Sequence, residues 1–253
     1  MKKIVLLSAV AGLLLTACKK EGSSETTTTP GAKTLKKVTK TEGGQTTVYT
    51  FNYDAAHRLT SIRTADNSEH TDFTYDGNGN ITRTEEIEEG FRNVYTYIYS
   101  NGLPASATFK SWQQHPGEPE ELIEDDVLTY TVTNNQVSRI HLNMLQASEE
   151  SDFNLTYTNG NLTRVVSGGG LLGYTATFTY GTKKAAFPKL YKYVLDQAGF
   201  SLQFFGGNEL LSETIDLPGT AFDVNMSMQY TYDADGNVLT STDGSATLKF
   251  EYQ

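Results

Sequence analysis

Pairs of aromatic residues two positions apart recur along the chain, and polar residues stand between them. Such pairs are Phe51 and Tyr53, Phe73 and Tyr75, Phe178 and Tyr180, and Phe250 and Tyr252. A period of two places both rings of a pair on one face of a β-strand. The intervening positions are mostly threonine, which suits the solvated face of an antiparallel sheet. The pattern therefore predicts half-buried strands.

Turn sequences follow these strands. The segments Asp76-Gly77-Asn78-Gly79 and Asp233-Ala234-Asp235-Gly236 place Asp first and Gly fourth. Asp caps a type I turn, and Gly accepts the left-handed conformation that closes a bulged hairpin. Asn-Gly pairs at 101–102 and 159–160 serve shorter loops. Each aromatic pair with its turn predicts a β-hairpin.

The hairpin unit repeats along the chain. Clear copies span 50–62, 72–83, 152–164 and 229–241, looser copies span 95–106 and 128–140, and half units occur at 177–181 and 249–253. The anchor tyrosines of the units are Tyr53, Tyr75, Tyr97, Tyr130, Tyr157, Tyr180, Tyr232 and Tyr252. So many strands exceed what an open twisted sheet usually holds. We therefore predict an all-β fold, a repetitive antiparallel hairpin meander that forms one large curled sheet: a rolled sheet, an irregular barrel or a sandwich.

The repeat is interrupted between residues 182 and 222. Within this insert, Leu190, Tyr193, Val194 and Gln197 have helical spacing, and Pro188 suits a first helical turn, so a short helix is predicted over 187–197. Apolar residues follow, with Gly206-Gly207 as a turn. We expect the insert to cover the dry face of the sheet or plug its end; a ligand pocket rimmed by its aromatic residues is the alternative.

The N-terminus indicates export. Two lysines precede an apolar run from Ile4 to Leu15, which is too short to span a membrane as a helix but suits a signal peptide. The run ends in Leu15-Thr16-Ala17-Cys18, which resembles the lipobox of bacterial lipoproteins. The resemblance implies cleavage after residue 17 and lipidation of Cys18. Residues 18–33 then form the lipidated cysteine and a polar tether, and 34–253 form a single β domain.

Composition narrows the list of partners. The formal net charge is −10, and no stripe of basic and aromatic residues offsets it, so nucleic acid is excluded as a partner. Cys18 is the one cysteine of the chain, so no intramolecular disulfide forms and the core must hold the domain together.

The segment Tyr230-Thr231-Tyr232-Asp233-Ala234-Asp235-Gly236-Asn237-Val238 resembles the YD repeat of Rhs-type proteins. With a lipobox in front, the chain looks like the YD-repeat lipoproteins of Bacteroidota, whose domain has no assigned function. The resemblance implies a β-hairpin sheet at the cell envelope, and it implies no chemistry. Large Rhs proteins enclose a toxin; this chain has fewer units and ends on a repeat.

Few residues suggest chemistry. We assign no catalytic residue, cofactor or metal. Alternating oxygen-bearing side chains make calcium candidates of Asp76, Asn78, Asn80, Asp233, Asp235 and Asn237, although the turns account for all six. Trp112, expected in a long loop from Ser111 to Asp126, is a candidate ligand contact through stacking on a sugar. The acidic clusters at 85–89 and 118–126 are expected in solvated loops.

The sequence therefore predicts a non-enzymatic lipoprotein of the outer membrane, periplasmic or surface-exposed, that is attached through the lipid on Cys18. It would act as a β-repeat scaffold or a binding module for a protein or glycan. A glycan hydrolase and a structural accessory of an outer-membrane uptake or secretion complex are the alternatives.

Overall fold

The computed structural model describes residues 33–115, 117–168, 173–197, 199–218 and 223–253. In these residues it contains seventeen strands and one short helix. The elements are β1 (Leu35–Glu42), β2 (Gln45–Tyr53), β3 (Leu59–Arg63), β4 (His70–Tyr75), β5 (Ile81–Glu88), β6 (Phe91–Ser100), β7 (Leu103–Gln113), β8 (Glu121–Thr133), β9 (Gln136–Met144), β10 (Glu149–Thr158), β11 (Asn161–Gly168), β12 (Thr175–Lys184), α1 (Phe200–Phe205), β13 (Asn208–Asp216), β14 (Val224–Ser227), β15 (Gln229–Tyr232), β16 (Val238–Thr242) and β17 (Ala246–Tyr252). No described helix is long and apolar enough to cross a membrane.

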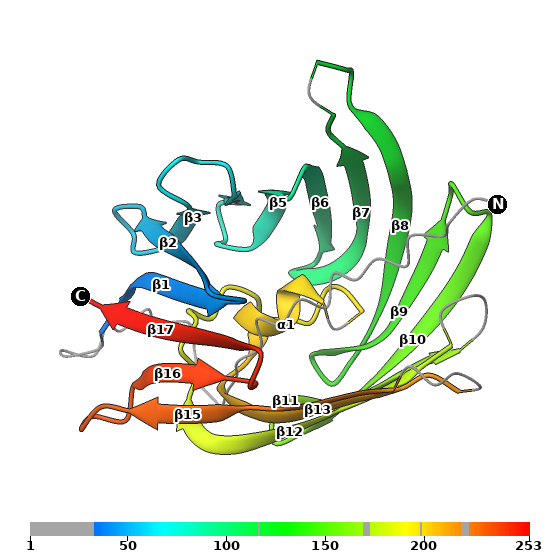
Figure 1. The fold of residues 1–253 in the computed structure, drawn as a ribbon. Helices are drawn as coiled ribbons and strands as arrows, with labels where there is room; N and C mark the ends of the chain where they lie inside the picture. The colour runs from blue at the N-terminus through cyan, green and yellow to red at the C-terminus, as the bar shows by residue number, and fades with distance from the viewer. Residues whose placement is uncertain (1–32, 116, 169–172, 198, 219–222) are drawn as a thin grey trace.

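The strands form one antiparallel sheet that is almost closed into a barrel (Figure 1). Each strand from β1 to β13 pairs with its successor. Further on, β15, β16 and β17 pair in order, and β17 pairs with β1. Only Met228 separates β14 from β15; β14 pairs with β13, and β15 pairs with β16. The predicted curled hairpin sheet is confirmed, in its barrel form.

The antiparallel order gives the barrel two distinct ends. The end at which β1 begins, here called the near end, holds the Asp-containing turns after β2, β4 and β15. The opposite end, here called the far end, holds the β1–β2, β3–β4 and β5–β6 turns and the long β7–β8 hairpin. Because β17 runs back toward the start of β1, both termini of the domain lie at the near end: the Thr34 and Gln253 backbones exchange two hydrogen bonds.

The turns have the predicted geometry. The pairing of β4 with β5 shifts register between Thr74 and Tyr75, which is the bulge of a bulged hairpin, and Gly79 has a φ of 78°. In the first unit His57 takes the equivalent left-handed position, with a φ of 58°. Asp76 accepts hydrogen bonds from the backbone N–H groups of Asn78 and Asn80. The repeated Asp therefore holds the turn together.

The repeated tyrosine joins neighbouring strands. Its hydroxyl donates to a backbone carbonyl at the start of the preceding strand of its pair, at 2.5–3.0 Å. The six pairs are Tyr53 and Leu35, Tyr75 and Leu59, Tyr99 and Ile81, Tyr157 and Val137, Tyr180 and Leu162, and Tyr252 and Val238. We call these bonds the tyrosine ladder. Tyr232 departs from the pattern and donates to the Glu209 side chain.

Two of the predicted anchor tyrosines, Tyr97 and Tyr130, lie two residues before the anchor position of their units. The bulge of the third unit lies at Tyr99, and that of the fourth lies at Val132, so Tyr97 and Tyr130 occupy the position of the first aromatic residue of a pair. Both face the insert: Tyr97 packs edge-on against Tyr191, and the Tyr130 hydroxyl donates to the Leu195 carbonyl at 2.6 Å.

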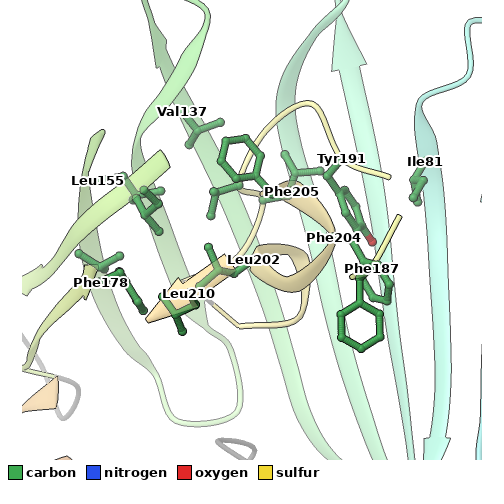
Figure 2. Packing of buried hydrophobic residues seen from close by; sticks show 14 of the residues in the cluster. Ile81, Val137, Leu155, Phe178, Phe187, Tyr191, Leu202, Phe204, Phe205 and Leu210 are labelled. Carbon is green, nitrogen blue, oxygen red and sulfur yellow. The ribbon is translucent and has the colours of Figure 1, made fainter. Parts of the chain in front are cut away.

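The insert fills the barrel. Residues 186–197 and 199–205 run through its interior and join one continuous apolar core with the inward side chains of the strands (Figure 2). Leu202 is 2% exposed and Phe204 is 1% exposed. The expectation of a plug is confirmed by this placement. Part of the predicted insert 182–222 belongs to the sheet, because β12 extends to Lys184 and β13 pairs with it.

The predicted helix over 187–197 was misplaced: that segment is irregular, and the helix is α1 at Phe200–Phe205. The Asp196 carboxylate explains the shift, because it accepts the backbone N–H groups of Gly199 and Ser201 at 2.6 Å and so starts the helix after itself. The backbone N–H groups of Leu190 and Leu195 also bond outside a helix, to the Phe204 carbonyl and the Ser201 hydroxyl.

Candidate functional site

A pocket opens between the insert and the inner face of the sheet, toward the far end of the barrel. Side chains of the five strands from β1 to β5 form its wall, and the insert forms the opposite side. The cavity between these walls has a volume of about 80 Å³, and the space is about 560 Å³ when the open solvent at its mouth is included. The lining includes Tyr49, Phe51, Glu69, Thr71, Glu86, Glu88, Phe187, Phe200, Gln203 and Phe204.

Phenylalanine rings form the apolar side of the pocket. The Phe187 ring lies 6.0 Å from Phe51 and 5.7 Å from Phe204, and Phe200 lies 5.3 Å from Phe204. Phe204 also meets Phe73 edge-on at 5.7 Å. Offset and edge-on contacts of this kind hold the rings in fixed positions. The insert residues Phe187 and Phe204 are buried, so this side is part of the rigid core.

Glu86 brings a carboxylate into this apolar surrounding. On β5, Thr84 points inward, since it is 1% exposed and shares a 2.7 Å hydrogen bond with the Tyr191 hydroxyl of the insert. Glu86 is two residues further along the strand and therefore lies on the same inner face. Its carboxylate accepts a 3.2 Å hydrogen bond from the Asn93 amide. Loss of hydration, with the nearby charge of Glu88, raises the pKa of Glu86 to about 7.

More acidic groups stand at the mouth. Burial raises the pKa of Glu88, and repulsion from Glu69 and Glu89 adds to the shift. Glu69 accepts a 2.5 Å hydrogen bond from the Tyr49 hydroxyl. Burial, together with this bond to an acceptor, raises the pKa of Tyr49. The nearby lysine, Lys40, is already paired with Glu42 at 2.7 Å. The pocket therefore carries an excess of negative charge.

The acidic clusters were expected in solvated loops, but most of their residues lie on strands. Glu85, Glu86 and Glu88 lie on β5, and Glu121, Glu124, Asp125 and Asp126 lie on β8, while Glu118 and Glu120 remain in the connection between β7 and β8. Strand alternation explains the error, because only every second carboxylate is turned to solvent. Asp125, for example, is paired outward with Lys110, whereas Asp126 is buried and its pKa is raised to about 7 by burial and by the charge of Glu124.

Glu86 on β5 and Glu124 on β8, two of the inward acidic groups, are far apart. Register places Glu86 opposite Asn93, Asn93 opposite Ser111, and Ser111 opposite Glu124 across β5, β6, β7 and β8. Three inter-strand steps of about 4.8 Å separate Glu86 from Glu124 by roughly 14 Å. Paired glycosidase carboxylates stand about 5–9.5 Å apart, so Glu86 and Glu124 do not form such a pair across a cleft.

Trp112 lies on β7 and not in a loop, since the strand continues to Gln113. Its ring is on the outer side of the barrel, opposite Arg92 on β6, and the Arg92 guanidinium covers one face of the ring at 4.0 Å. Arg92 is fixed in turn by Glu85 and Glu120. The structure therefore does not bring Trp112 into the pocket.

The Asp side chains among the calcium candidates accept hydrogen bonds within their own turns. Asp76 binds Asn78 and Asn80, and Asp233 accepts bonds from the backbone N–H groups of Asp235 and Asn237 and from the Asn237 amide. Lys33 adds a cation at 2.7 Å from Asp233 and 2.9 Å from Asp235. This lysine takes the place at the second turn where a metal ion would need to bind.

Within the part of the chain that the structure describes, no group of three or more His, Cys, Asp or Glu side chains is arranged to hold a metal. The predicted lipidation site, Cys18, lies outside the described residues.

One segment of the chain matches a known family model. The family model RHS Repeat matches residues 53–86, which run from the end of β2 through the β4–β5 hairpin to Glu86. The chain carries a YD repeat. The matched segment therefore supplies part of one wall of the pocket, whereas Tyr49, Phe51 and the insert lie outside it.

Solved structures share the fold. A porin-like protein from Bacteroides uniformis ATCC 8492 superposes with a TM-score of 0.53 at 18% identity, covering 87% of this chain and 96% of that chain. A porin-like protein from Bacteroides vulgatus ATCC 8482 gives a TM-score of 0.56 at 15% identity, covering 87% and 98%. At these identities the likeness concerns the fold alone. No curated protein matches the chain.

Proposed function

We propose that the protein is a lipid-anchored, non-enzymatic binding module of the cell envelope, in which the YD-repeat barrel is a rigid scaffold. The observation that carries the proposal is that the start of the domain and the pocket lie at opposite ends of the barrel. The chain begins β1 at the near end, whereas the pocket opens toward the far end. A lipid on Cys18 would hold the near end toward the membrane, and the far end would be presented to ligands.

The near end is suited to this orientation. Lys33, the first described residue, is fixed to the Asp233 turn, so the described chain begins at this end. Exposed lysines of β12 and the insert lie at the same end: Lys183 stands over the Tyr232 ring, and Lys192 approaches Asn80 of a near-end turn. Lysines close to an anionic membrane surface add about 1 kcal/mol each to attachment. Residues 19–32 could span at most roughly 50 Å.

A filled scaffold is favoured over a channel. The solved neighbours are described as porin-like, but the interior of this barrel is packed by the insert, with Val194 and Phe204 buried at 0% and 1% exposure. The outward positions of the strands are mainly polar, for example Thr96 on β6 and Thr129 on β8, whereas strands that face lipid turn apolar side chains outward. The barrel is therefore proposed to stand in water beside the membrane.

The proposal is tested in cells with the full chain. Wild type and Cys18→Ala are compared by membrane fractionation and by mass spectrometry of the mature N-terminus. We expect diacylated Cys18 in the membrane fraction and release of the variant into the soluble fraction. Protease treatment of intact cells, with a periplasmic control protein, then shows whether the far end faces the medium or the periplasm. An unmodified Cys18, or a variant that stays in the membrane fraction, would contradict the anchor.

A further inference from the structure

The pocket of the far end contains a feature that a plain structural core would not need. A carboxylate, Glu86, lies against an apolar wall that includes Phe51, Phe187, Phe200 and Phe204. Burial of a carboxylate costs free energy unless a cation or several hydrogen bonds compensate it. The structure gives Glu86 a neutral partner, the Asn93 amide, at a rather long 3.2 Å.

The charges around Glu86 do not neutralise it. The ionisable groups that face the pocket or its mouth are Lys40 and Glu42 of β1, Tyr49 of β2, Glu69 and His70 at the start of β4, and Glu86, Glu88 and Glu89 at the end of β5. The insert contributes phenylalanine and Gln203 to the lining. Since Lys40 pairs with Glu42 and Tyr49 with Glu69, the Glu86 carboxylate is left without a cation, whereas Lys40 still attracts Glu88 through its charge.

From this geometry we infer that the pocket binds an organic amine: a primary ammonium group that meets Glu86, carried on a small aromatic or branched apolar body that packs against the phenylalanine rings. This inference rests on the proposed binding function and names its ligand class. A cation beside an aromatic wall is attracted by both the carboxylate and the ring faces. The Thr71 hydroxyl and the Gln203 amide, both in the lining, supply further acceptors for an ammonium group.

Other ligand classes fit less well. An anion would meet Glu69, Glu86 and Glu88 and would be repelled. A sugar usually stacks on an exposed aromatic face, and the tryptophan of this chain lies on the outer side of the barrel with one face covered by Arg92. A neutral apolar molecule would leave the Glu86 charge uncompensated. The amine satisfies both parts of the pocket.

The test uses the full-length lipoprotein in nanodiscs of zwitterionic lipid, with empty discs as the background. Binding of 4-fluorophenethylamine and of its neutral analogue 2-(4-fluorophenyl)ethanol is measured by fluorine NMR. We expect the amine to bind about tenfold or more tightly than the alcohol, the factor that one charge-assisted hydrogen bond supplies. Equal affinity for the two probes, or no binding of the amine, would overturn the inference.

Variants locate the site. Glu86→Gln is expected to weaken amine binding about tenfold or more and to leave the alcohol unaffected. Glu213→Gln is the matched control: Glu213 is a buried carboxylate on the inner side, its pKa is raised to about 7 by burial as that of Glu86 is, and it lies on β13, outside the pocket lining. An equal loss in both variants would overturn the assignment to Glu86. The two-probe comparison on the wild type decides the ligand class even if a variant does not fold.

The pH dependence of amine binding provides a second measurement. With a pKa of about 7, Glu86 is mostly ionised at pH 8 and mostly neutral at pH 6, whereas the amine stays protonated at both. Affinity should therefore fall about tenfold from pH 8 to pH 6, and the fall should disappear in Glu86→Gln. A fall that persists in the variant would assign the effect to another group and contradict the inference. Absence of amine binding by a protein that is lipidated and oriented in cells would reject this ligand while leaving the proposed function in place.

Discussion

The tyrosine ladder gives the strongest test of how the repeat stabilises the barrel. The Tyr75 hydroxyl donates to the Leu59 carbonyl at 2.6 Å, and burial raises the pKa of Tyr75 to about 12. Tyr75→Phe removes the hydroxyl and keeps the ring, including its contact with the Arg58 guanidinium at 4.9 Å. Loss of one partly buried hydrogen bond costs about 1 kcal/mol of unfolding free energy. Six such bonds would amount to about 6 kcal/mol, a large part of the usual stability of a domain.

The assay is urea unfolding followed by fluorescence and by far-UV circular dichroism, because coincident transitions are needed before a free energy is assigned. Tyr193→Phe is the control, since the structure gives the Tyr193 hydroxyl no hydrogen bond within the described residues. The double variant Tyr75→Phe with Tyr180→Phe should lose about 2 kcal/mol, because the two bonds lie on separate hairpins and should add. If Tyr75→Phe unfolds like the control, the ladder does not stabilise the barrel and the repeated tyrosine needs another explanation.

Two further predictions concern the interior. Phe204→Ala should cost about 3–5 kcal/mol in urea unfolding, because a buried ring in contact with Phe73 and Phe187 is lost; Phe204→Leu should cost clearly less, and equal losses would argue against a close-packed plug. Glu213 should make the protein less stable as pH rises: its pKa is near 4.5 in the unfolded chain and about 7 when folded, so the folded state holds the proton more tightly between these values. Stability lost from pH 5 to pH 8 should reach up to about 3 kcal/mol, and Glu213→Gln should flatten that slope in unfolding measurements across the range; an unchanged slope would contradict the shift.

The hairpins could be predicted from the sequence because their signals are local. Alternation of aromatic and polar residues specifies a strand, and Asp with Gly at fixed positions specifies a bulged turn. Closure of the barrel could not be predicted in this way, since the pairing of β17 with β1 joins residues more than two hundred positions apart, such as Val38 and Phe250. The helix was misplaced for a related reason: Leu190 and Val194 face the core from an irregular segment, and apolar contacts on all sides there imitate helical spacing.

The pocket was missed because its acidic wall looks like a solvated cluster in the sequence. Glu85 and Glu86 are neighbours, yet Glu85 pairs outward with Arg83 and Arg92, whereas Glu86 points inward. Alternation alone would have separated them, but the bulge near Ile81 shifts the phase of the strand, and the sequence does not show on which residue the shift falls. Placing Thr84 inside requires its contact with Tyr191, which lies over a hundred residues away.

The different structural roles of the repeat, which forms the barrel wall, and of the insert, which fills the interior, explain the position of the pocket. Repeated hairpins build nearly equivalent walls around the barrel, so no single hairpin distinguishes one part of the interior from another. The insert breaks this equivalence, because it enters the interior from β12 and places Phe187, Phe200 and Phe204 against β2 and β4 on one side. On the other side Tyr130 binds the Leu195 carbonyl and Tyr174 binds the Gln197 carbonyl, which fix the same segment to the sheet. The pocket therefore belongs to the insert as much as to the repeat. A related barrel that keeps its YD units but changes its insert should keep the fold and change its ligand.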